Sequence, residues 1–496
     1  MYYRKELKLR KSSSAVLNLA NFSAGMSSDT DENILPLRYA ALAYNYSVGS
    51  GALRDGLSAL PLNLKNAQGQ DADCGVIAGE SVTRLWHYRR YDFERGERDD
   101  RLLAYTASKK IFWRSITGAD DFKELDGAYF NAVPEAVNYR LNGDDVIILC
   151  SGSENMMVWD GENYPYYVAS SPFIVSMDIH YERLFAVVGG EQNSLWFSED
   201  LNPTNWDLSL DNAGFIDMVD ERGRMLKVIS FLDYVYVFRE FGISRVTAYA
   251  EQEYFTASQL FVSSGRIEGA TICVCGDRIV FLAEDGLYVF DGISTRAVLP
   301  NLKGLLINAD KSRASAVFVN GRYYLACRLD YGDGENIGCE AHAGGFINNT
   351  LIELDVRTLS CNLHRGLDAL CLCALKGAER SFPAACINDG VNGRIAEIGQ
   401  GENLTGPLKR VWTTPLTDLG SPKTKVFKEL TLQSDKDMVL RIETEKEKRE
   451  IEIAGGGAKR VRLGGLSGKL MRASFISETG GTRITSPRIV FDILDR

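Results

Sequence analysis

Four residues in the second half of the chain are of the types that bind zinc. Cys361, His364, Cys371 and Cys373 occur in the order Cys-x2-His-x6-Cys-x-Cys. Structural zinc sites usually separate paired cysteines by at least two residues, and only one lies between Cys371 and Cys373. Side chains two positions apart in a strand point to the same face. We therefore interpret this cysteine pair as small buried core residues and predict no metal and no cofactor.

A dense group of carboxylates, Asp330-Tyr-Gly-Asp-Gly-Glu335, could in principle bind calcium. It lacks the twelve-residue loop and the closing bidentate Glu of an EF-hand site. It opens a segment rich in Gly and Asn, residues 330–350, that reads as a loop. We interpret it as a solvated turn or an interface loop.

The stretch Ser198-Glu-Asp-Leu-Asn-Pro-Thr-Asn-Trp206 resembles the Asp-box of sialidase-like propellers, Ser-x-Asp-x-Gly-x-Thr-Trp. In that box the Asp accepts backbone hydrogen bonds within a turn, and the Trp packs into a blade. Here Asn202 replaces the Gly and one extra residue precedes the Trp. The box is structural even in enzymes. We therefore expect Ser198, Asp200 and Trp206 to form a structural turn, and we nominate no catalytic residue.

Positive charge gathers near the C-terminus, and glutamates between residues 443 and 450 offset part of it. One interpretation is a solvated sheet face. The other is a surface that docks on an acidic neighbour, such as the acidic body of the next subunit. The candidate interface residues are Lys423, Lys425, Lys428, Lys459, Arg460 and Arg462.

The net charge of −10 is unevenly distributed. Residues 1–12 carry +4 and residues 407–496 carry +6, so the middle of the chain carries −20. An acidic body with basic ends is unlike a protein that wraps nucleic acid, and it suits DNA that passes without sequence-specific binding.

The composition, with 45% hydrophobic and 25% charged residues, is ordinary for a globular protein. There are 46 glycines, 22 Phe, 22 Tyr and 6 Trp, but only 4 histidines. Aromatic strands with Gly turns favour an all-β chain, and scarce His weakens acid–base or metal chemistry. We expect no secretory signal, no membrane span and free thiols.

Secondary-structure elements must position these residues, and the sequence pattern predicts that the elements are short strands. A strand–turn–strand–turn–strand pattern is clearest at residues 270–292. Its closing strands recur at intervals of 38 to 64 residues, which fits blade repeats. The spacing predicts a six- or seven-bladed β-propeller over residues 75–400, and the alternative is two unrelated β-domains. The closing strands begin near Ile111, Met156, Ser194, Val235, Leu287, Leu351 and Ile395.

The remaining segments flank this propeller. Residues 1–74 read as an N-terminal arm with a short helix at 36–45 and a hairpin at 46–54, and residues 13–65 could supply the strand that closes the ring. A linker follows at 400–406, and longer alternating strands predict a C-terminal β-sandwich at 407–496.

Three stretches, residues 21–56, 194–206 and 412–430, resemble the β-propeller virion proteins of tailed bacteriophages. The first begins Asn21-Phe-Ser-Ala-Gly-Met and ends Gly51-Ala-Leu-Arg-Asp-Gly56, similar to the family's opening helix and hairpin. The second, Ser194-Leu-Trp-Phe-Ser-Glu-Asp-Leu-Asn-Pro-Thr-Asn-Trp206, is similar to a hairpin with Asn-Pro and a following Trp that is common in these propellers. The third, Trp412-Thr-Thr-Pro-Leu-Thr-Asp-Leu-Gly, is similar to the start of the family's C-terminal sandwich. Asp55 departs from the more usual Arg-Pro-Gly hairpin.

The resemblance implies a structural, non-enzymatic virion protein of the tail nozzle, neck or hub, from a bacteriophage or a prophage. Its expected partners are copies of itself in a ring and other virion tail proteins, with assembly in the bacterial host cytoplasm and DNA ejected past it. The alternative function is a glycan-binding or glycan-cleaving, sialidase-like propeller, and a host-surface glycan stays open as a partner.

Overall fold

The structure is a computed structural model, and it describes residues 12–19, 22–49, 51–93, 95–191, 193–210, 212–218, 221–249, 251–335, 348–377 and 380–494. The basic residues 1–11, Asn21 and most of the insertion at 330–350 lie outside these ranges. Within them nearly all regular structure is antiparallel strand, so the all-β prediction is confirmed. The helical elements there are α1 (Lys303–Ile307) and the 3-10 turns η1 (Leu208–Leu210), η2 (Gln252–Tyr254), η3 (Gly269–Thr271) and η4 (Pro300–Leu302).

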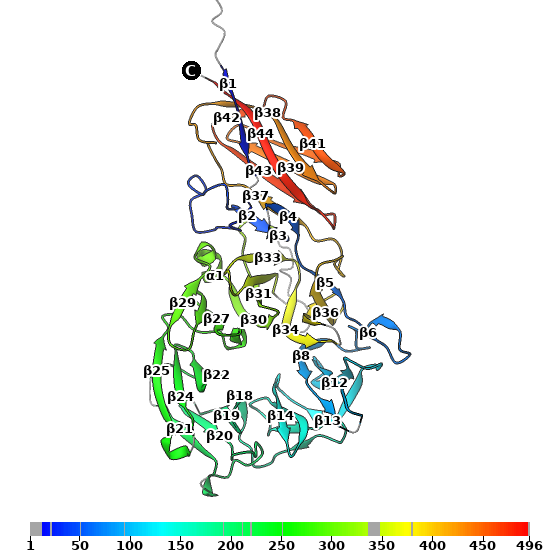
Figure 1. The fold of residues 1–496 in the computed structure, drawn as a ribbon, viewed down its shortest axis with the longest axis vertical. Coiled ribbons are helices and arrows are strands. Elements are labelled where there is room, and N and C mark those ends of the chain that lie inside the picture. The colour runs from blue at the N-terminus through cyan, green and yellow to red at the C-terminus, as the bar shows by residue number, and fades with distance from the viewer. Residues whose placement is uncertain are drawn as a thin grey trace, which may run out of the picture.

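Seven four-stranded antiparallel sheets follow one another along the chain, and Figure 1 shows them side by side in a ring. In pairing order within each sheet, the strands are β8 (Val82–Tyr88), β11 (Arg101–Thr106), β12 (Lys110–Ser115) and β13 (Lys123–Tyr129); β14 (Glu135–Leu141), β15 (Asp144–Cys150), β16 (Met157–Trp159) and β17 (Tyr166–Tyr167); β18 (Ile174–His180), β19 (Arg183–Val188), β20 (Ser194–Phe197) and β21 (Gly214–Asp217); β22 (Met225–Phe231), β23 (Tyr234–Arg239), β24 (Gly242–Thr247) and β25 (Thr256–Val262); β26 (Cys273–Val274), β27 (Ile279–Ala283), β28 (Gly286–Phe290) and β29 (Thr295–Val298); β30 (Asp310–Val319), β31 (Arg322–Arg328), β32 (Thr350–Asp355) and β33 (Cys361–Arg365); and β34 (Ala369–Lys376), β35 (Ser381–Asn388), β36 (Gly393–Gly399) and β5 (Ser58–Pro61).

The first strands of these sheets connect the ring from one sheet to the next. β14 contacts β18, β18 contacts β22, β26 contacts β30, β30 contacts β34, and β34 contacts β8 of the first sheet. Side chains bridge the other two boundaries. Arg84 of β8 pairs with Glu135 of β14 at 2.9 Å, and the Lys227 ammonium donates to the carbonyl of Ile272 at 3.1 Å. Every sheet therefore has a neighbour on both sides, which buries the apolar faces of its strands.

The last sheet of the ring takes its outer strand from the N-terminal part of the chain. β5 pairs with β36, and Ala59 lies opposite Ile398. This sheet therefore joins segments that are more than 300 residues apart in sequence. The strand expected from residues 13–65 is β5.

Two further sheets form the second part of the molecule. The seven-stranded sheet has the order β3 (Tyr46–Gly49), β4 (Ala52–Asp55), β44 (Ile484–Leu494), β38 (Lys425–Ser434) and β41 (Gly457–Arg462), with β1 (Ser12–Asn18) on β44 and β42 (Ser467–Gly468) on β38. The five-stranded sheet has the order β2 (Leu42–Tyr44), β37 (Arg410–Thr413), β43 (Met471–Ser477), β39 (Met438–Thr444) and β40 (Lys448–Ile453). We call these two sheets together the sandwich. Two short ladders complete the strands: β6 (Asn63–Lys65) with β7 (Asp71–Asp73), and β9 (Tyr91–Asp92) with β10 (Glu97–Arg98).

The N-terminal segment differs from the prediction in two ways. The helix predicted at 36–45 is wrong: residues 36–41 form turns and a bridge, and Leu42–Tyr44 is strand β2. The Ala41 amide donates to the carbonyl of Thr413 at 2.9 Å, and β2 pairs with β37. A helix this short is only marginally stable by itself, so the segment instead forms a strand that pairs with β37. Four strands of the segment, β1 to β4, also belong to the sandwich, and only β5 joins the ring.

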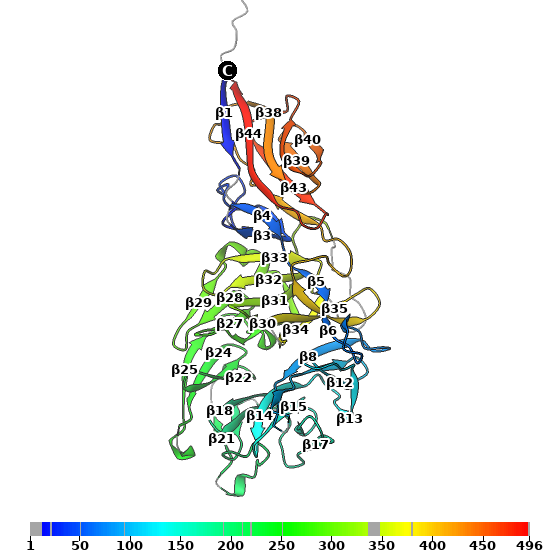
Figure 2. The ribbon, with the colours of Figure 1, turned by 45° about the vertical axis from the view of Figure 1, so that its right-hand side comes forward.

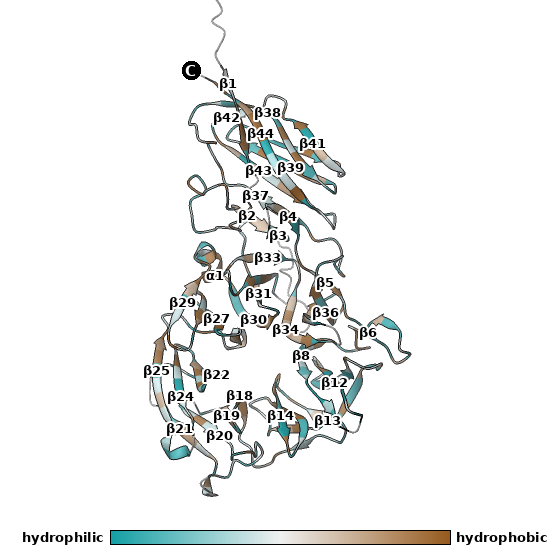
Figure 3. Ribbon diagram, viewed as in Figure 1, coloured by the Kyte–Doolittle hydropathy of each residue, from teal (hydrophilic) through white to brown (hydrophobic). Residues whose placement is uncertain are grey.

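One continuous apolar core links the ring to the sandwich. It contains Leu325 and Leu354 from the ring, Phe427 and Phe475 from the two sandwich sheets, and Tyr44 between them. Figure 2 shows β3 and β4 lying between β33 and the rest of the sandwich, and Figure 3 shows hydrophobic segments within the strands of both parts. No helix among the described residues is long and apolar enough to cross a bilayer.

Candidate functional site

Polar residues, some of them with fully buried side chains, gather where the ring meets the sandwich, and we call this region the joint. It contains Asn45, Asp55, Gly56, Arg322, Asp333, Glu353, Asn362, His364, Arg365, Lys409 and Arg410. Asn45 has a positive φ of 60°, which Asn tolerates better than most residues. Its amide donates to the carbonyls of Arg365 (2.9 Å) and Lys409 (2.7 Å), and its oxygen accepts from the Arg365 N–H at 2.7 Å. One buried side chain thus satisfies three backbone groups from two segments of the chain.

The Arg365 side chain is the charged centre of the joint and is 1% exposed. Its guanidinium binds the Asp333 carboxylate through two contacts, of 2.6 and 3.2 Å, and lies against the ring of Tyr331, 4.4 Å from its centroid. Burial alone would raise the pKa of Asp333, but the bonds and charge of Arg365 lower it below its ordinary value. The carboxylates proposed as a turn or interface loop at 330–335 therefore include a partner for this arginine.

A second buried cluster lies on β32 and β33. The Glu353 carboxylate accepts from Asn362 (3.0 Å) and lies 3.3 Å from Nε2 of His364, while Arg322 pairs with its other oxygen at 2.9 Å. Burial would raise the pKa of Glu353, but these partners lower it to about 2. Nδ1 of His364 accepts the backbone N–H of Leu57 at 3.1 Å, so its Nε2 carries the proton that is donated to Glu353.

Gly56 is the residue that lets the N-terminal segment approach this cluster. A Cβ at this position would lie 2.6 Å from Nδ1 of His364 and 2.9 Å from the carbonyl oxygen of Asn45. The Val48 N–H also donates to Asn362 at 3.2 Å. Side chains of the ring thus bind backbone groups of the hairpin segment directly. At position 56 there is no room for a residue larger than Gly.

The third contact of the joint reaches into the sandwich. Arg410, at the start of β37, forms an ion pair with Asp55 of β4 at 2.8 Å, and its side chain is 5% exposed. The same carboxylate accepts the backbone N–H of Thr482 at 3.0 Å and that of Gly481. Asp55 of the seven-stranded sheet therefore binds both β37 of the five-stranded sheet and the loop between β43 and β44.

The geometry of the joint suits a structural role, in which it holds the ring and the sandwich together. Most of its donors and acceptors pair with one another, although Nε of Arg365 has no hydrogen-bond partner, and such networks hold buried segments in one arrangement. No sequence pattern indicates Asn45, Arg365 or Arg410 as functional residues. One signal in the sequence does point to the joint, namely Asp55, which departs from the more usual Arg-Pro-Gly hairpin.

The turn expected at 198–206 is structural, but one of its three residues does not have the predicted role. Ser198 is buried, accepts the Leu184 N–H at 3.0 Å, and donates to the Glu199 carbonyl. Trp206 is also buried, and its indole donates to the carbonyl of Pro203 at 3.0 Å. Asp200 is exposed, and the role predicted for it is wrong. The neighbouring carboxylate of Glu199 accepts side-chain amides, and not the backbone amides that were predicted for the Asp. These side-chain amides come from Asn202, Asn205 and Asn212, at 2.8 to 3.0 Å.

The candidate interface residues fall into three groups. Lys423, Lys459 and Arg462 are exposed or half-exposed. Lys428 and Arg460 are engaged with Asp492 (2.8 Å) and Glu429 (2.6 Å) on the same sheet. Lys425 was wrongly selected, because it is fully buried.

The Lys425 ammonium is held by backbone carbonyls. It donates to those of Lys423 (2.9 Å), Lys469 (2.8 Å) and Ser421. Burial lowers the pKa of Lys425 below its ordinary value. This lysine therefore stabilises the beginning of β38 and cannot contact a partner.

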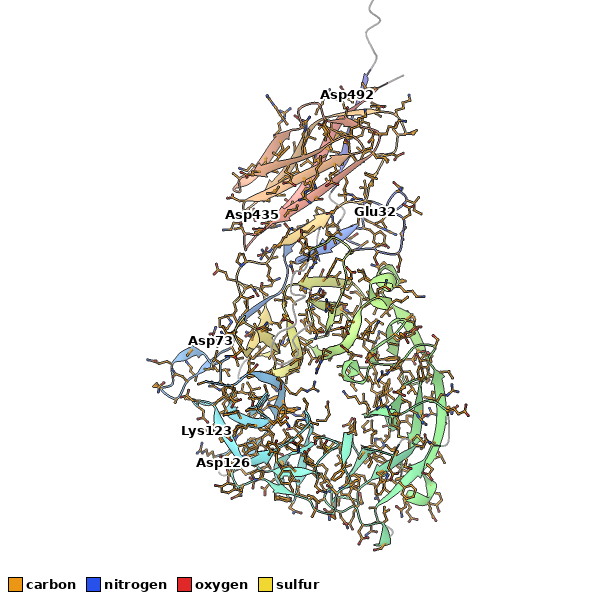
Figure 4. All side chains as sticks on the ribbon, turned by 180° about the vertical axis from the view of Figure 1, so that it is seen from behind. Glu32, Asp73, Lys123, Asp126, Asp435 and Asp492 are labelled. Atoms are coloured by element: carbon orange, nitrogen blue, oxygen red, sulfur yellow. The ribbon has the colours of Figure 1, made fainter. Side chains whose placement is uncertain are left out.

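The outer face of the seven-stranded sheet also presents Arg488, which the sequence analysis missed. Arg488 and Arg460 both lie opposite Thr431 of β38, and Arg462 lies opposite Glu429. We call Arg460, Arg462 and Arg488 the arginine face. Figure 4 shows Asp492 of the same sheet at the far end of the sandwich from the ring, whereas Asp73, Lys123 and Asp126 lie on the flank of the ring.

The cysteine and histidine residues first considered for zinc do not form one site. His364 belongs to the joint, while Cys371 and Cys373 lie in a separate apolar core of the ring. No group of three or more His, Cys, Asp or Glu among the described residues is placed to hold a metal ion.

Comparison with known proteins gives no family. No protein-family model matches the chain, and no curated protein matches it by sequence. Among solved structures, Raptor from Chaetomium thermophilum is similar over 57% of this chain, with a TM-score of 0.35 and 10% identity. BBS1N, solved in complex with ARL6DN, is similar over 73% of this chain and all of its own, with a TM-score of 0.41 and 11% identity. The match spans about a quarter (26%) of the Raptor chain.

Proposed function

We propose that the seven sheets form a seven-bladed β-propeller, and that the protein is a structural component of a bacteriophage or prophage-derived tail. In this proposal it builds part of a nozzle, neck or hub through contacts with its own copies and with other tail proteins, and has no catalytic role. The propeller is supported by the order of the sheets, by the contact of β34 with β8 and by the strand β5 supplied from the N-terminal part. The phage assignment is supported by the three resembling stretches in the sequence.

The observation that carries the assembly proposal is the joint. Parts of a chain connected through small polar contacts move relative to each other by default, whereas a large apolar contact holds them in place. Here one apolar core extends from the ring into the sandwich. The hydrogen bonds of Asn45 and the ion pair of Asp55 add polar contacts to this apolar one. A subunit built this way can present two surfaces at a fixed angle, which a closed ring of copies requires.

The distribution of charge along the chain supports an electrostatic contact between copies. The chain between residues 13 and 406 carries −20, and the arginine face lies on a part of the chain that carries +6. Opposite potentials steer association and fix its orientation. We propose that the arginine face of one copy docks on the acidic ring of the next, and that the acidic body leaves passing DNA unbound.

The test is to locate the chain on native particles. Electron microscopy of particles from a producing culture, labelled with an antibody against the sandwich, should show the label at one position on the tail. The purified full-length chain should also form rings. A chain found only as a monomer that hydrolyses a glycan, with hydrolysis lost on substitution of one carboxylate, would overturn the proposal in favour of the sialidase-like alternative.

A further inference from the structure

Two cysteines face each other in the sheet that closes the ring. Cys371 of β34 and Cys386 of β35 are directly opposite residues of an antiparallel pair. Both are buried, and their Sγ atoms lie 3.1 Å apart. Cys373 lies on the same strand and face two residues away, but opposite Ala384. The chain therefore provides both a facing pair of thiols and a matched cysteine without a facing partner.

The backbone geometry at this pair suits a disulfide. Opposite residues of antiparallel strands have Cα atoms about 4.5 to 5.5 Å apart. A disulfide needs a Cα separation of about 4.4 to 6.8 Å and an S–S bond of about 2.05 Å. The two sulfur atoms therefore need to approach by roughly 1 Å, which side-chain rotation can supply without displacing either strand.

One cysteine of the pair lines a hollow in the protein. Cys371 lines a hollow of about 480 Å³, together with Arg84, Tyr105, Ser315 and Leu370. Burial raises the pKa of Cys371, but the adjacent Cys386 thiol and the Arg84 guanidinium outweigh this and lower it overall. Burial raises the pKa of Cys386. The thiol nearer the hollow is thus the one that more readily becomes a thiolate.

We propose that Cys371 and Cys386 are an oxidation site, which hydrogen peroxide converts to a cross-strand disulfide. The Cys371 thiolate attacks one peroxide oxygen, the O–O bond breaks, and the departing hydroxide takes a proton to become water. The resulting sulfenic acid is attacked by Sγ of Cys386. The S–O bond breaks, and the second hydroxide takes the Cys386 proton and leaves as water. Two thiols and one peroxide thus become one disulfide and two water molecules.

The bond would fasten the sheet that joins the two ends of the ring. Its strands include β36, which carries β5, so it contains the strand pairing that links the N-terminal part to the ring. A cross-link between β34 and β35 restricts the unfolded chain and should raise the melting temperature of the oxidised protein. The site does not depend on the proposed virion role.

Peptide mapping after mild peroxide treatment of the folded full-length protein tests the site. Trypsin releases Cys371 and Cys373 in one peptide, residues 366–376, and Cys386 in another, residues 381–394. We expect these two peptides to appear joined, lighter than their sum by two hydrogen atoms, and to separate after reduction. The Cys373→Ser variant should still form the joined species, whereas Cys371→Ser and Cys386→Ser should lose it.

The oxidised wild-type protein should also melt at a higher temperature than the reduced protein, with no such shift in Cys371→Ser. Three results would overturn the proposal: no joined peptide before the protein unfolds, a joined peptide that is lost in Cys373→Ser, or sulfinic acid at Cys371 without cross-linking. A circular dichroism spectrum of each variant before oxidation shows that it is folded, so loss of the bond cannot be confused with loss of structure.

Discussion

The carboxylate of Asp55 and the guanidinium of Arg410 lie 2.8 Å apart, although 354 residues separate them in the chain. The pair is largely shielded from water, since the Asp55 side chain is 19% exposed and that of Arg410 5%. Asp55 also holds the backbone at Thr482, so one side chain fixes three segments. This contact anchors the two sheets of the sandwich to each other.

Replacing Asp55 by Asn should therefore destabilise the protein strongly. Arg410 would stay buried without its counter-charge, and removal of one partner of a buried pair costs about 3 kcal/mol or more. Urea unfolding followed by tryptophan fluorescence measures this loss. The control is Glu429→Gln, which breaks the exposed pair with Arg460 and should change the free energy of unfolding by about 0.5 kcal/mol at most. Equal effects of the two substitutions would contradict the anchoring role of Asp55.

Asn45→Ala should cost more than the same change at another left-handed Asn. It leaves the Arg365 N–H and two carbonyls without their partner, and each unsatisfied buried group costs about 1 kcal/mol or more. Asn142 has a similar φ of 53° but lies in an exposed turn between β14 and β15, so Asn142→Ala reports the backbone cost alone. The unfolding free energy of Asn45→Ala should be lower than that of Asn142→Ala by about 3 kcal/mol or more. If the two variants are equally stable, the three hydrogen bonds of Asn45 contribute nothing.

The Glu353 cluster predicts a specific dependence of stability on pH. The pKa of Glu353 is about 2 in the folded protein and 4.5 ordinarily, so its ionised form favours folding. That contribution, about 3 kcal/mol, is complete above about pH 5 and is lost as the pH falls towards 2. The unfolding free energy of the wild type minus that of Glu353→Gln should shrink across this range. A difference that is the same at pH 7 and pH 3 would contradict this prediction.

Charge reversal on the arginine face should weaken self-association. We expect the double variant Arg462→Glu with Arg488→Glu to associate about tenfold more weakly than the wild type at low salt, because like charges would then face the acidic ring. Sedimentation velocity in about 50 mM and about 500 mM salt measures this, and salt should reduce the difference. Lys446→Glu is the control, since it lies in an exposed turn of the other sheet. Equal weakening by the control would mean that total charge, and not this face, governs association.

Much of the ring was predictable because its strands are short, apolar and separated by turn residues. The pattern at 270–292 predicted β26, β27 and β28 with turns at Gly276 and Gly286, and both glycines have positive φ. Six of the seven closing strands were placed in or beside the third strand of a sheet. Val235 instead falls in β23, the second strand of its sheet. A long run of alternating residues does not show which of its strands is the third strand of the sheet.

The joint could not be predicted, because its partners are far apart in sequence. Asn45 contacts residues 320 and 364 positions away, and no local pattern records such a pairing. The helix error at 36–45 has the same origin, since β2 exists only because β37 pairs with it. Lys425 was misassigned because composition marks a lysine as exposed, whereas three backbone carbonyls make its burial tolerable.

The pairing of β1 with β44 and of β5 with β36 has a consequence for biosynthesis. Both the sandwich and the last sheet of the ring take strands from early and late parts of the chain. The last sheet of the ring cannot be completed on the ribosome before β36 has emerged, and the sandwich cannot be completed before β44 has emerged. A product that ends before β44 would lack Arg488, so only chains that include this strand present the full arginine face. The topology itself thus excludes incomplete copies from any assembly that uses this face.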